Sequence, residues 1–329
     1  MKEKAFKKWY ELNKLKDEDY RHAVEVLKDY ENYLRRNCIS DFNTLTLSDL
    51  DQLISYLVIT NQNTIPNFVS LMRYFKMINK SDHFIHLTKY TGAIGVVESI
   101  LTKLSKVANP LITKDIIDQI DVPVLGTNLR DITKFTSMFI ALLESKLSDH
   151  ELRLVLADNH HHIPKEAFIQ EKIFYEAAPT LEAYLKDLHQ RKIAELTHFY
   201  KTGQVWYEQE MTQEVIDFVS SNQEIMSAVL LDEALYITKI PYDTKKYLSA
   251  QSKEDQSYYL CHCPFAREAL RNPSFTISAN WCYCSGGFTK FPFDIIFDQD
   301  LEIEMLDSAL RMDNACRFKI DLKHIDYKK

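Results

Sequence analysis

Glycine and long apolar runs are scarce in this chain. The first scarcity argues against a disordered protein, and the second argues against a membrane-spanning one. Only six of the 329 residues are glycine, while 46% are apolar. Such a composition predicts a chain that folds from end to end and contains little disorder. No stretch reaches the roughly 18 consecutive apolar residues of a membrane-spanning helix. We therefore expect no membrane partner.

Export signals are also missing from the start of the sequence. Residues 1–6 mix charged and apolar side chains, and no apolar run follows them. This pattern excludes a signal peptide, so we expect a cytoplasmic protein whose thiols stay reduced. In that compartment, clustered cysteines indicate a metal site or thiol chemistry more often than disulfides.

The net charge of −7 is unevenly distributed. Residues 1–110 carry 16 Lys and Arg against 13 Asp and Glu, whereas the remainder carries 24 against 34. The negative charge of the C-terminal two thirds would repel the phosphate backbone of a nucleic acid. Nucleic acid is therefore not indicated as a partner. No phosphate-binding loop, Gly-x-Ser-x-Gly elbow or His-Glu-x-x-His helix occurs either.

The patterning predicts an α+β fold, with a helical N-terminal half and a C-terminal mixed domain with antiparallel strands. We divide the chain into a helical bundle at 1–110, a helical middle region at 111–203 and a cysteine-rich α+β domain at 204–329. Two helix signals are specific. Ser48 with Asp51 resembles a capping box, and Thr180 is placed to cap a helix that stops at Gly203.

Strands are expected only in the last third. Residues 315–322 alternate apolar and charged side chains with a period of two, and residues 301–305 alternate likewise. Met312-Asp313-Asn314 would turn these two into a hairpin. Shorter strands are expected at 236–240 and 275–277.

Five of the six cysteines lie within residues 261–316. Four form the pairs Cys261-His262-Cys263 and Cys282-Tyr283-Cys284, and the fifth is Cys316. Two pairs of thiolates could supply the four ligands of a zinc ion. We therefore predict zinc as the cofactor, with these four paired cysteines as its ligands.

The spacing of the pairs restricts this prediction. Residues i and i+2 of an extended strand lie about 6.6 Å apart. Two sulfur atoms on one tetrahedral zinc lie closer, at about 3.8 Å. Each pair must therefore sit in a turn, which Pro264 and the segment Ser285-Gly286-Gly287 would provide. Cys316 and His262 are alternative ligands, although the apolar strand face around Cys316 equally predicts a buried structural thiol.

Further polar residues near the pairs suit a small-molecule ligand. Arg267, expected at the start of a helix, could bind a carboxylate, and His262 is a second candidate contact. The competing interpretation of Arg267 is a surface salt bridge, and that of Lys290 is simple solvation. His160-His161-His162 resembles a metal site, but a polar loop explains three consecutive histidines better.

These motifs resemble known families. Residues 258–267, 275–288 and 304–318 resemble a bacterial family of unknown function. They are also similar to the 4-vinyl reductase domain. That resemblance implies a small-molecule-binding α+β module that can hold zinc through cysteines, here Cys261, Cys263, Cys282, Cys284 and Cys316. The final turn at 312–314 lacks the glycine typical of that domain.

Residues 1–90, and Leu45 to Leu50 above all, resemble the helical core-binding domain of tyrosine recombinases. We expect a shared bundle shape and no recombinase activity.

Three functional hypotheses follow. The first is small-molecule binding or sensing through the zinc-bound cysteine region, with a homodimer as one expected assembly. The second is a metal- or thiol-dependent enzyme, hydrolase or redox, that uses the same cysteines. The third is a DNA- or protein-binding regulator that acts through the N-terminal helices.

Overall fold

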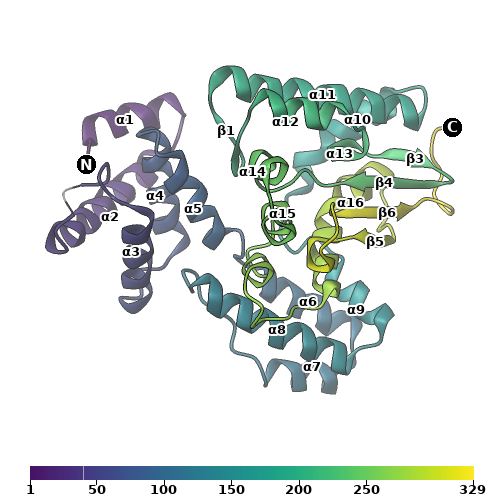
Figure 1. The fold of residues 1–329 in the computed structure, drawn as a ribbon, viewed down its shortest axis with the longest axis horizontal. Coiled ribbons are helices and arrows are strands. Elements are labelled where there is room, and N and C mark those ends of the chain that lie inside the picture. The colour runs from purple at the N-terminus through teal and green to yellow at the C-terminus, as the bar shows by residue number, and fades with distance from the viewer. Residues whose placement is uncertain (40) are drawn as a thin grey trace. The chain divides into compact units, whose positions relative to one another are not determined.

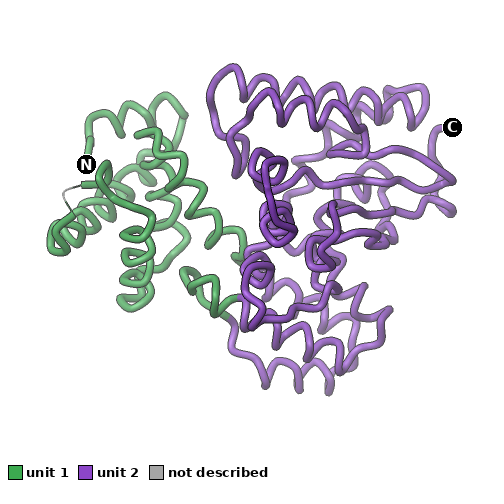
Figure 2. Tube along the Cα trace, in the orientation of Figure 1, with its two compact units in different colours: residues 1–94, 123–132 green, residues 95–122, 133–329 purple. Residues whose placement is uncertain are grey.

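The computed structural model describes residues 1–39 and 41–329. The chain folds into two compact units (Figure 2). Unit 1 comprises residues 1–94 and 123–132, and unit 2 comprises residues 95–122 and 133–329. The domain boundaries predicted from the sequence stay a prediction, because compactness does not test which segments fold independently.

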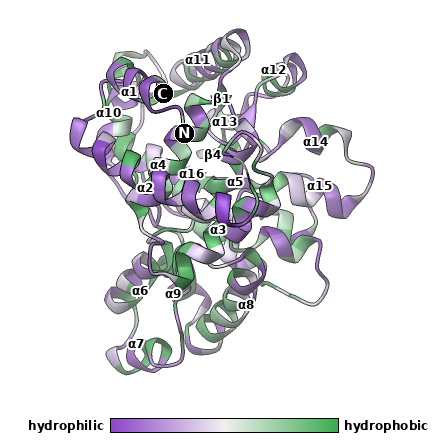
Figure 3. Cartoon of the chain, turned by 90° about the vertical axis from the view of Figure 1, so that its left-hand side faces the viewer, coloured by the Kyte–Doolittle hydropathy of each residue, from purple (hydrophilic) through white to green (hydrophobic). Residues whose placement is uncertain are grey.

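Unit 1 is a bundle of short amphipathic helices that bury one apolar face each. Figure 3 shows hydrophilic and hydrophobic residues mixed along these helices, as a surface helix over a core requires. Phe6, Leu27 and Phe68 are among the fully buried side chains. The helices are α1 (Glu3–Leu12), α2 (Asp17–Arg36), α3 (Leu47–Ile59), α4 (Ile65–Met77) and α5 (Ser81–Thr91).

Helix α3 begins two residues before the position predicted from the sequence. Thr46 is its N-cap and forms a capping box with Asp49, with an N–H to Oγ1 distance of 3.2 Å. The predicted box of Ser48 with Asp51 is wrong. Ser48 already lies inside the helix, and the Asp51 carboxylate accepts hydrogen bonds from His86 and Tyr90.

Unit 2 begins with helices and ends with a mixed region. Thr180 caps α11, where its side chain accepts from the Ala183 N–H at 3.1 Å, and Gly203 ends that helix at φ +63°. Both sequence predictions are confirmed, since a left-handed φ suits glycine. The helices are α6 (Val96–Val107), α7 (Pro110–Ile117), α8 (Leu129–Lys146), α9 (Asp149–Leu156), the 3-10 helix η1 (Lys165–Phe168), α10 (Ile169–Ala177) and α11 (Leu181–Thr202). The first four residues of α8 are counted in unit 1.

A four-stranded antiparallel sheet follows, in the order β3-β4-β6-β5 (Figure 1). Its strands are β3 (Val229–Leu231), β4 (Ala234–Thr238), β5 (Ile303–Asp307) and β6 (Arg317–Asp321). Phe318 and Ile320 of β6 are fully buried, whereas the charged residues that alternate with them are half-buried. The predicted α+β class and the predicted pairing of these last two strands are confirmed.

The remaining elements precede β3 or lie between the sheet strands along the chain. They are the hairpin strands β1 (Val205–Trp206) and β2 (Gln209–Glu210), the helices α12 (Gln213–Ser220), α13 (Glu224–Ser227), α14 (Thr244–Ser249), α15 (Lys253–Leu260) and α16 (Tyr283–Phe297), and the 3-10 helices η2 (Arg267–Leu270), η3 (Ala279–Cys282) and η4 (Ala309–Arg311). The predicted strand at 275–277 is wrong. The Thr276 carbonyl accepts from Ser137 Oγ of α8 at 2.6 Å and not from a strand.

The predicted turn at Ser285-Gly286-Gly287 is also wrong, because these residues lie in the first turns of α16. Gly286 and Gly287 have no side chains, which lets the helix approach its neighbours closely. A Cβ at Gly286 would meet the Phe318 ring at 3.3 Å. A Cβ at Gly287 would lie 2.3 Å from the backbone N and O of Asp158, after α9. Glycine therefore fixes where α16 sits.

No helix among the described residues is both long enough and apolar enough to cross a membrane.

Candidate functional site

The five C-terminal cysteines come from separate elements of unit 2. Cys261 and Cys263 lie in the loop that follows α15. Cys282 ends η3, Cys284 is the second residue of α16, and Cys316 immediately precedes β6. Every cysteine in the described part of the chain is a free thiol.

The fold packs three of these thiols together in an apolar cluster. Cys261, Cys263 and Cys316 belong to one apolar cluster with Tyr247 and Leu260. Cys261, Cys282 and Cys284 are buried, and the other two are half-buried. Burial raises the pKa of all five thiols above the ordinary value. Without a ligand they are neutral thiols at neutral pH.

The thiols differ in which other cysteines affect their pKa. After burial, the pKa of Cys282 is raised by the charges of Cys316, Cys261 and Cys263. Cys261 is likewise influenced by Cys263 and Cys316. Cys284 is influenced by Cys263 alone among the cysteines, while Lys239 lowers its pKa. Cys261, Cys263 and Cys316 thus all raise the pKa of Cys282, whereas Cys263 is the cysteine that raises the pKa of Cys284.

Hydrogen-bond donors face several of these sulfur atoms. The Trp281 Nε1–H donates to Cys263 Sγ at 3.3 Å. Backbone N–H groups of Phe265 and Ala266 also donate to Cys263 and lower its pKa, against the larger effect of burial. Ser308 does the same for Cys282, and the Ala309 N–H for Cys316. Such donors favour thiolate over thiol.

The two Cys-x-Cys pairs have different backbone conformations. The first is followed by the predicted turn, in which the Cys263 carbonyl accepts the Arg267 N–H at 3.0 Å. The second runs from η3 directly into α16 with helical dihedral angles. Within residues 1–39 and 41–329, no three His, Cys, Asp or Glu side chains are already arranged to hold a metal ion.

Arg267 is buried, with 2% of its surface exposed, so the surface salt bridge considered for it is wrong. Its guanidinium lies 3.9 Å from the ring centroid of Tyr242 and 5.4 Å from that of Tyr258. Burial disfavours its charge, but both tyrosines raise its pKa above the ordinary value. In the described structure Nε and Nη1 have no hydrogen-bond partner, and the guanidinium pairs with no carboxylate.

His262 has oxygen atoms as its partners. Its Nε2 donates to the Ile240 carbonyl at 2.7 Å, and Nδ1 lies 3.9 Å from a carboxylate oxygen of Glu208. Burial lowers its pKa, which favours the neutral ring. The roles predicted for His262 and Arg267 in ligand binding stay predictions.

Lys239, at the end of β4, is the site residue that the sequence analysis missed. Its Nζ donates to Ser285 Oγ at 2.8 Å and lies 4.9 Å from the ring centroid of Phe288. Among the described side chains no carboxylate pairs with it. Its charge lowers the pKa of Cys263, Cys284 and Cys316. The one available signal was a lysine at the end of a predicted strand.

The remaining candidates have structural partners. His160 is fully buried between Ser99 Oγ at 3.0 Å and the Val155 carbonyl at 2.8 Å. His161 packs on Phe288, and burial lowers its pKa to about 4. The expected solvation of Lys290 is wrong, because this lysine is buried with Asp294.

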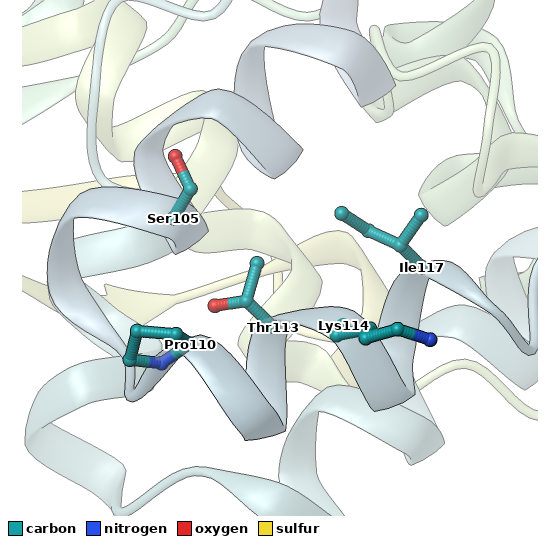
Figure 4. A pocket seen from close by; sticks show the side chains of 5 residues that line it. All are labelled: Ser105, Pro110, Thr113, Lys114 and Ile117. Atoms are coloured by element: carbon teal, nitrogen blue, oxygen red, sulfur yellow. The ribbon is translucent and has the colours of Figure 1, made fainter.

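One pocket lies away from the predicted residues (Figure 4). It has a volume of about 270 Å³ and is lined by Ser105, Pro110, Thr113, Lys114 and Ile117 of the α6–α7 region. None of the predicted site residues contributes to it, so it does not bear on the thiol cluster.

The comparisons with known proteins leave the activity open. No curated protein and no solved structure matches the chain. The resemblances to 4-vinyl reductase and recombinase domains are not shown. Residues 221–326, which contain all five clustered cysteines, are similar to the Family of unknown function (DUF6144).

Proposed function

We propose that the C-terminal region of unit 2 binds or senses a small molecule, and that its cysteine cluster holds zinc as a structural staple. The observation that carries this proposal is the packing of three free thiols, Cys261, Cys263 and Cys316, in one apolar cluster, and all three also influence the pKa of Cys282. Neutral thiols alone do not need to meet there, since each could be buried separately as a small apolar side chain.

The donor set suits a thiophilic ion. Thiolates are the preferred ligands of structural zinc, and N–H groups aimed at the sulfur atoms stabilise the thiolate form. Cysteine has one rotatable side-chain bond, so rotation between staggered positions can turn the sulfur atoms toward a shared ion. In their present positions, Cys263 and Cys282 already accept hydrogen bonds from Trp281 and Ser308, which favour the thiolate form.

The surrounding charges support the same assignment. Four thiolates around Zn²⁺ leave an excess of two negative charges, which a buried site must balance. Arg267 influences Cys261, and Lys239 influences Cys263 and Cys284. Neither cation is paired with a carboxylate in the described chain. Two such cations beside the sulfur atoms are what an anionic metal–thiolate centre requires.

The small molecule would bind on the partly exposed side of the cluster. There, Lys239 and Ser285 offer hydrogen bonds, and Phe288 offers an exposed ring. A lysine beside an aromatic ring suits a ligand with a carboxylate or another anionic group. A closed four-thiolate site leaves zinc no open position for catalysis, so we place binding ahead of metal-dependent chemistry.

The test is elemental analysis of the purified protein together with a native count of reactive thiols. We expect about one zinc per chain and four protected thiols for a closed site. A metal-free protein that also binds no added zinc, with thiols that all react, would contradict the proposal and favour thiol chemistry.

A further inference from the structure

We propose that Arg267 is the centre of a buried binding site for a carboxylate that carries a single negative charge. The site goes beyond the proposed function, because it uses none of the residues assigned to the small-molecule site, Lys239, Ser285 and Phe288, and it does not require zinc. It explains why a guanidinium is buried with no carboxylate of the described chain beside it.

Arg267 brings a full positive charge into the interior of unit 2. An arginine side chain does not lose its proton inside a protein, so its burial is the burial of a charge. A buried charge without a partner is strongly destabilising. The ring contacts with Tyr242 and Tyr258 offset only part of that cost, since cation–π attraction is weaker than an ion pair in the same surroundings. The guanidinium therefore requires a counter-charge.

The neighbouring acidic groups do not supply this counter-charge. Glu268 accepts a hydrogen bond from the Tyr258 hydroxyl at 3.1 Å, and Asp255 forms its ion pair with another arginine. The thiols do not supply it either, because burial keeps them neutral. Among the effects on the pKa of Cys261, that of Arg267 is the smallest. The counter-charge is therefore assigned to a bound anion.

The open donors of the guanidinium favour a carboxylate as that anion. Nε and Nη1 have no hydrogen-bond partner in the described structure. The Tyr242 ring covers a face of the guanidinium, whereas the N–H bonds point outward in the plane of the group, where a carboxylate oxygen accepts them. One guanidinium neutralises one negative charge. A phosphate would carry a second charge into the same buried site without a partner.

The backbone around the guanidinium is held in place before any anion binds. The Arg267 N–H donates to the Cys263 carbonyl at 3.0 Å, which closes the turn that leads into η2. The hydrogen bond between Tyr258 and Glu268 ties α15 to η2. A donor that is already fixed loses little conformational freedom on binding, so this arrangement favours a bound ligand.

The experiment measures thermal unfolding of the full chain in sodium acetate or sodium formate, against sodium chloride at matched ionic strength. A carboxylate that binds the folded chain raises the unfolding midpoint in a saturable way. We expect Arg267→Lys to weaken the apparent affinity roughly 10- to 100-fold, because lysine lacks the planar donors. Arg271→Lys is the matched control and should keep the response of the parent. Arg271 also contacts Tyr258, at 3.7 Å from its ring centroid, but already pairs with Asp255.

Sodium phosphate and a Lys239→Met variant separate the alternatives. If phosphate raised the midpoint more than acetate did, a singly charged carboxylate would be the wrong class of ligand. If Lys239→Met removed the response and Arg267→Lys kept it, the anion would belong to the proposed small-molecule site, and the inference about Arg267 alone would fail. No response of the parent chain to acetate or formate would overturn the inference and leave the zinc test of the proposed function unaffected.

Hydrogen–deuterium exchange of the parent chain needs no variant and covers the case in which Arg267→Lys does not fold. We expect saturating acetate to slow exchange within residues 258–270, compared with chloride, because a bound anion stabilises the segment that it contacts. Slower exchange confined to residues 283–290 would place the anion beside Lys239 and refute the site at Arg267. Equal exchange in acetate and chloride throughout residues 258–270 would refute it as well.

Discussion

Replacing Gly287 with alanine tests whether α16 packs as closely as the structure shows. The new Cβ would lie 2.3 Å from the N and O atoms of Asp158 and 2.7 Å from the carbonyl carbon of Ala157. These are backbone atoms, so no side-chain rotation can relieve the overlap. Either α16 or the loop after α9 must move.

The expected cost follows from this geometry. Overpacking a core usually costs about 1–3 kcal/mol, and a clash with backbone belongs at the upper end. Alanine in place of glycine returns up to about 1 kcal/mol of helix propensity, which offsets part of the cost. We therefore expect Gly287→Ala to lower the free energy of unfolding by about 2 kcal/mol. In a domain of this size the midpoint of thermal unfolding should fall by roughly 4–8 °C.

The neighbouring residue supplies a matched control. A Cβ at Gly286 would meet only side-chain atoms, at 3.3 Å on Phe318 and 3.5 Å on Ile303. These side chains can shift by a few tenths of an ångström, so we expect Gly286→Ala to change stability by less than about 1 kcal/mol. Chemical and thermal denaturation followed by circular dichroism would measure both. If Gly287→Ala were as stable as the parent, or less damaging than Gly286→Ala, the described packing of α16 would be wrong.

Three further predictions concern charges and caps. The two-point hydrogen bond with Arg317 lowers the pKa of Glu224, so its contribution is present above the unfolded pKa and is lost as pH falls through the folded value. We expect Glu224→Gln to cost about 1–2 kcal/mol at pH 7, and to cost progressively less below about pH 4.5 in urea titrations. Thr180→Ala should cost about 1 kcal/mol through loss of the cap, whereas Thr180→Ser should cost much less in the same titrations. Lys290→Met should cost about 3 kcal/mol by leaving the Asp294 carboxylate buried, and adding Asp294→Asn should recover part of that loss; a double variant as unstable as the single one would contradict this.

Local patterns predicted the parts of this fold that depend on near neighbours in sequence. A period of two identified β6, and the cap and stop residues identified α11, because these signals act within one strand or helix. The same reasoning failed for Gly286 and Gly287. Two adjacent glycines favour a turn locally, and only contacts with distant residues keep them helical.

The sequence by itself determined that the soft donors cluster between residues 261 and 316, and that the C-terminal region mixes strands with helices. Only the tertiary structure decided which of these thiols share surroundings, since Cys261, Cys263 and Cys316 pack in one apolar cluster, whereas Cys282 and Cys284 lie in helical backbone. Burial of Arg267 and the position of Lys239 were likewise decided by packing. The sequence shows which cysteines are available and how they are spaced. The direction in which each side chain points depends on the backbone conformation and on contacts between distant segments.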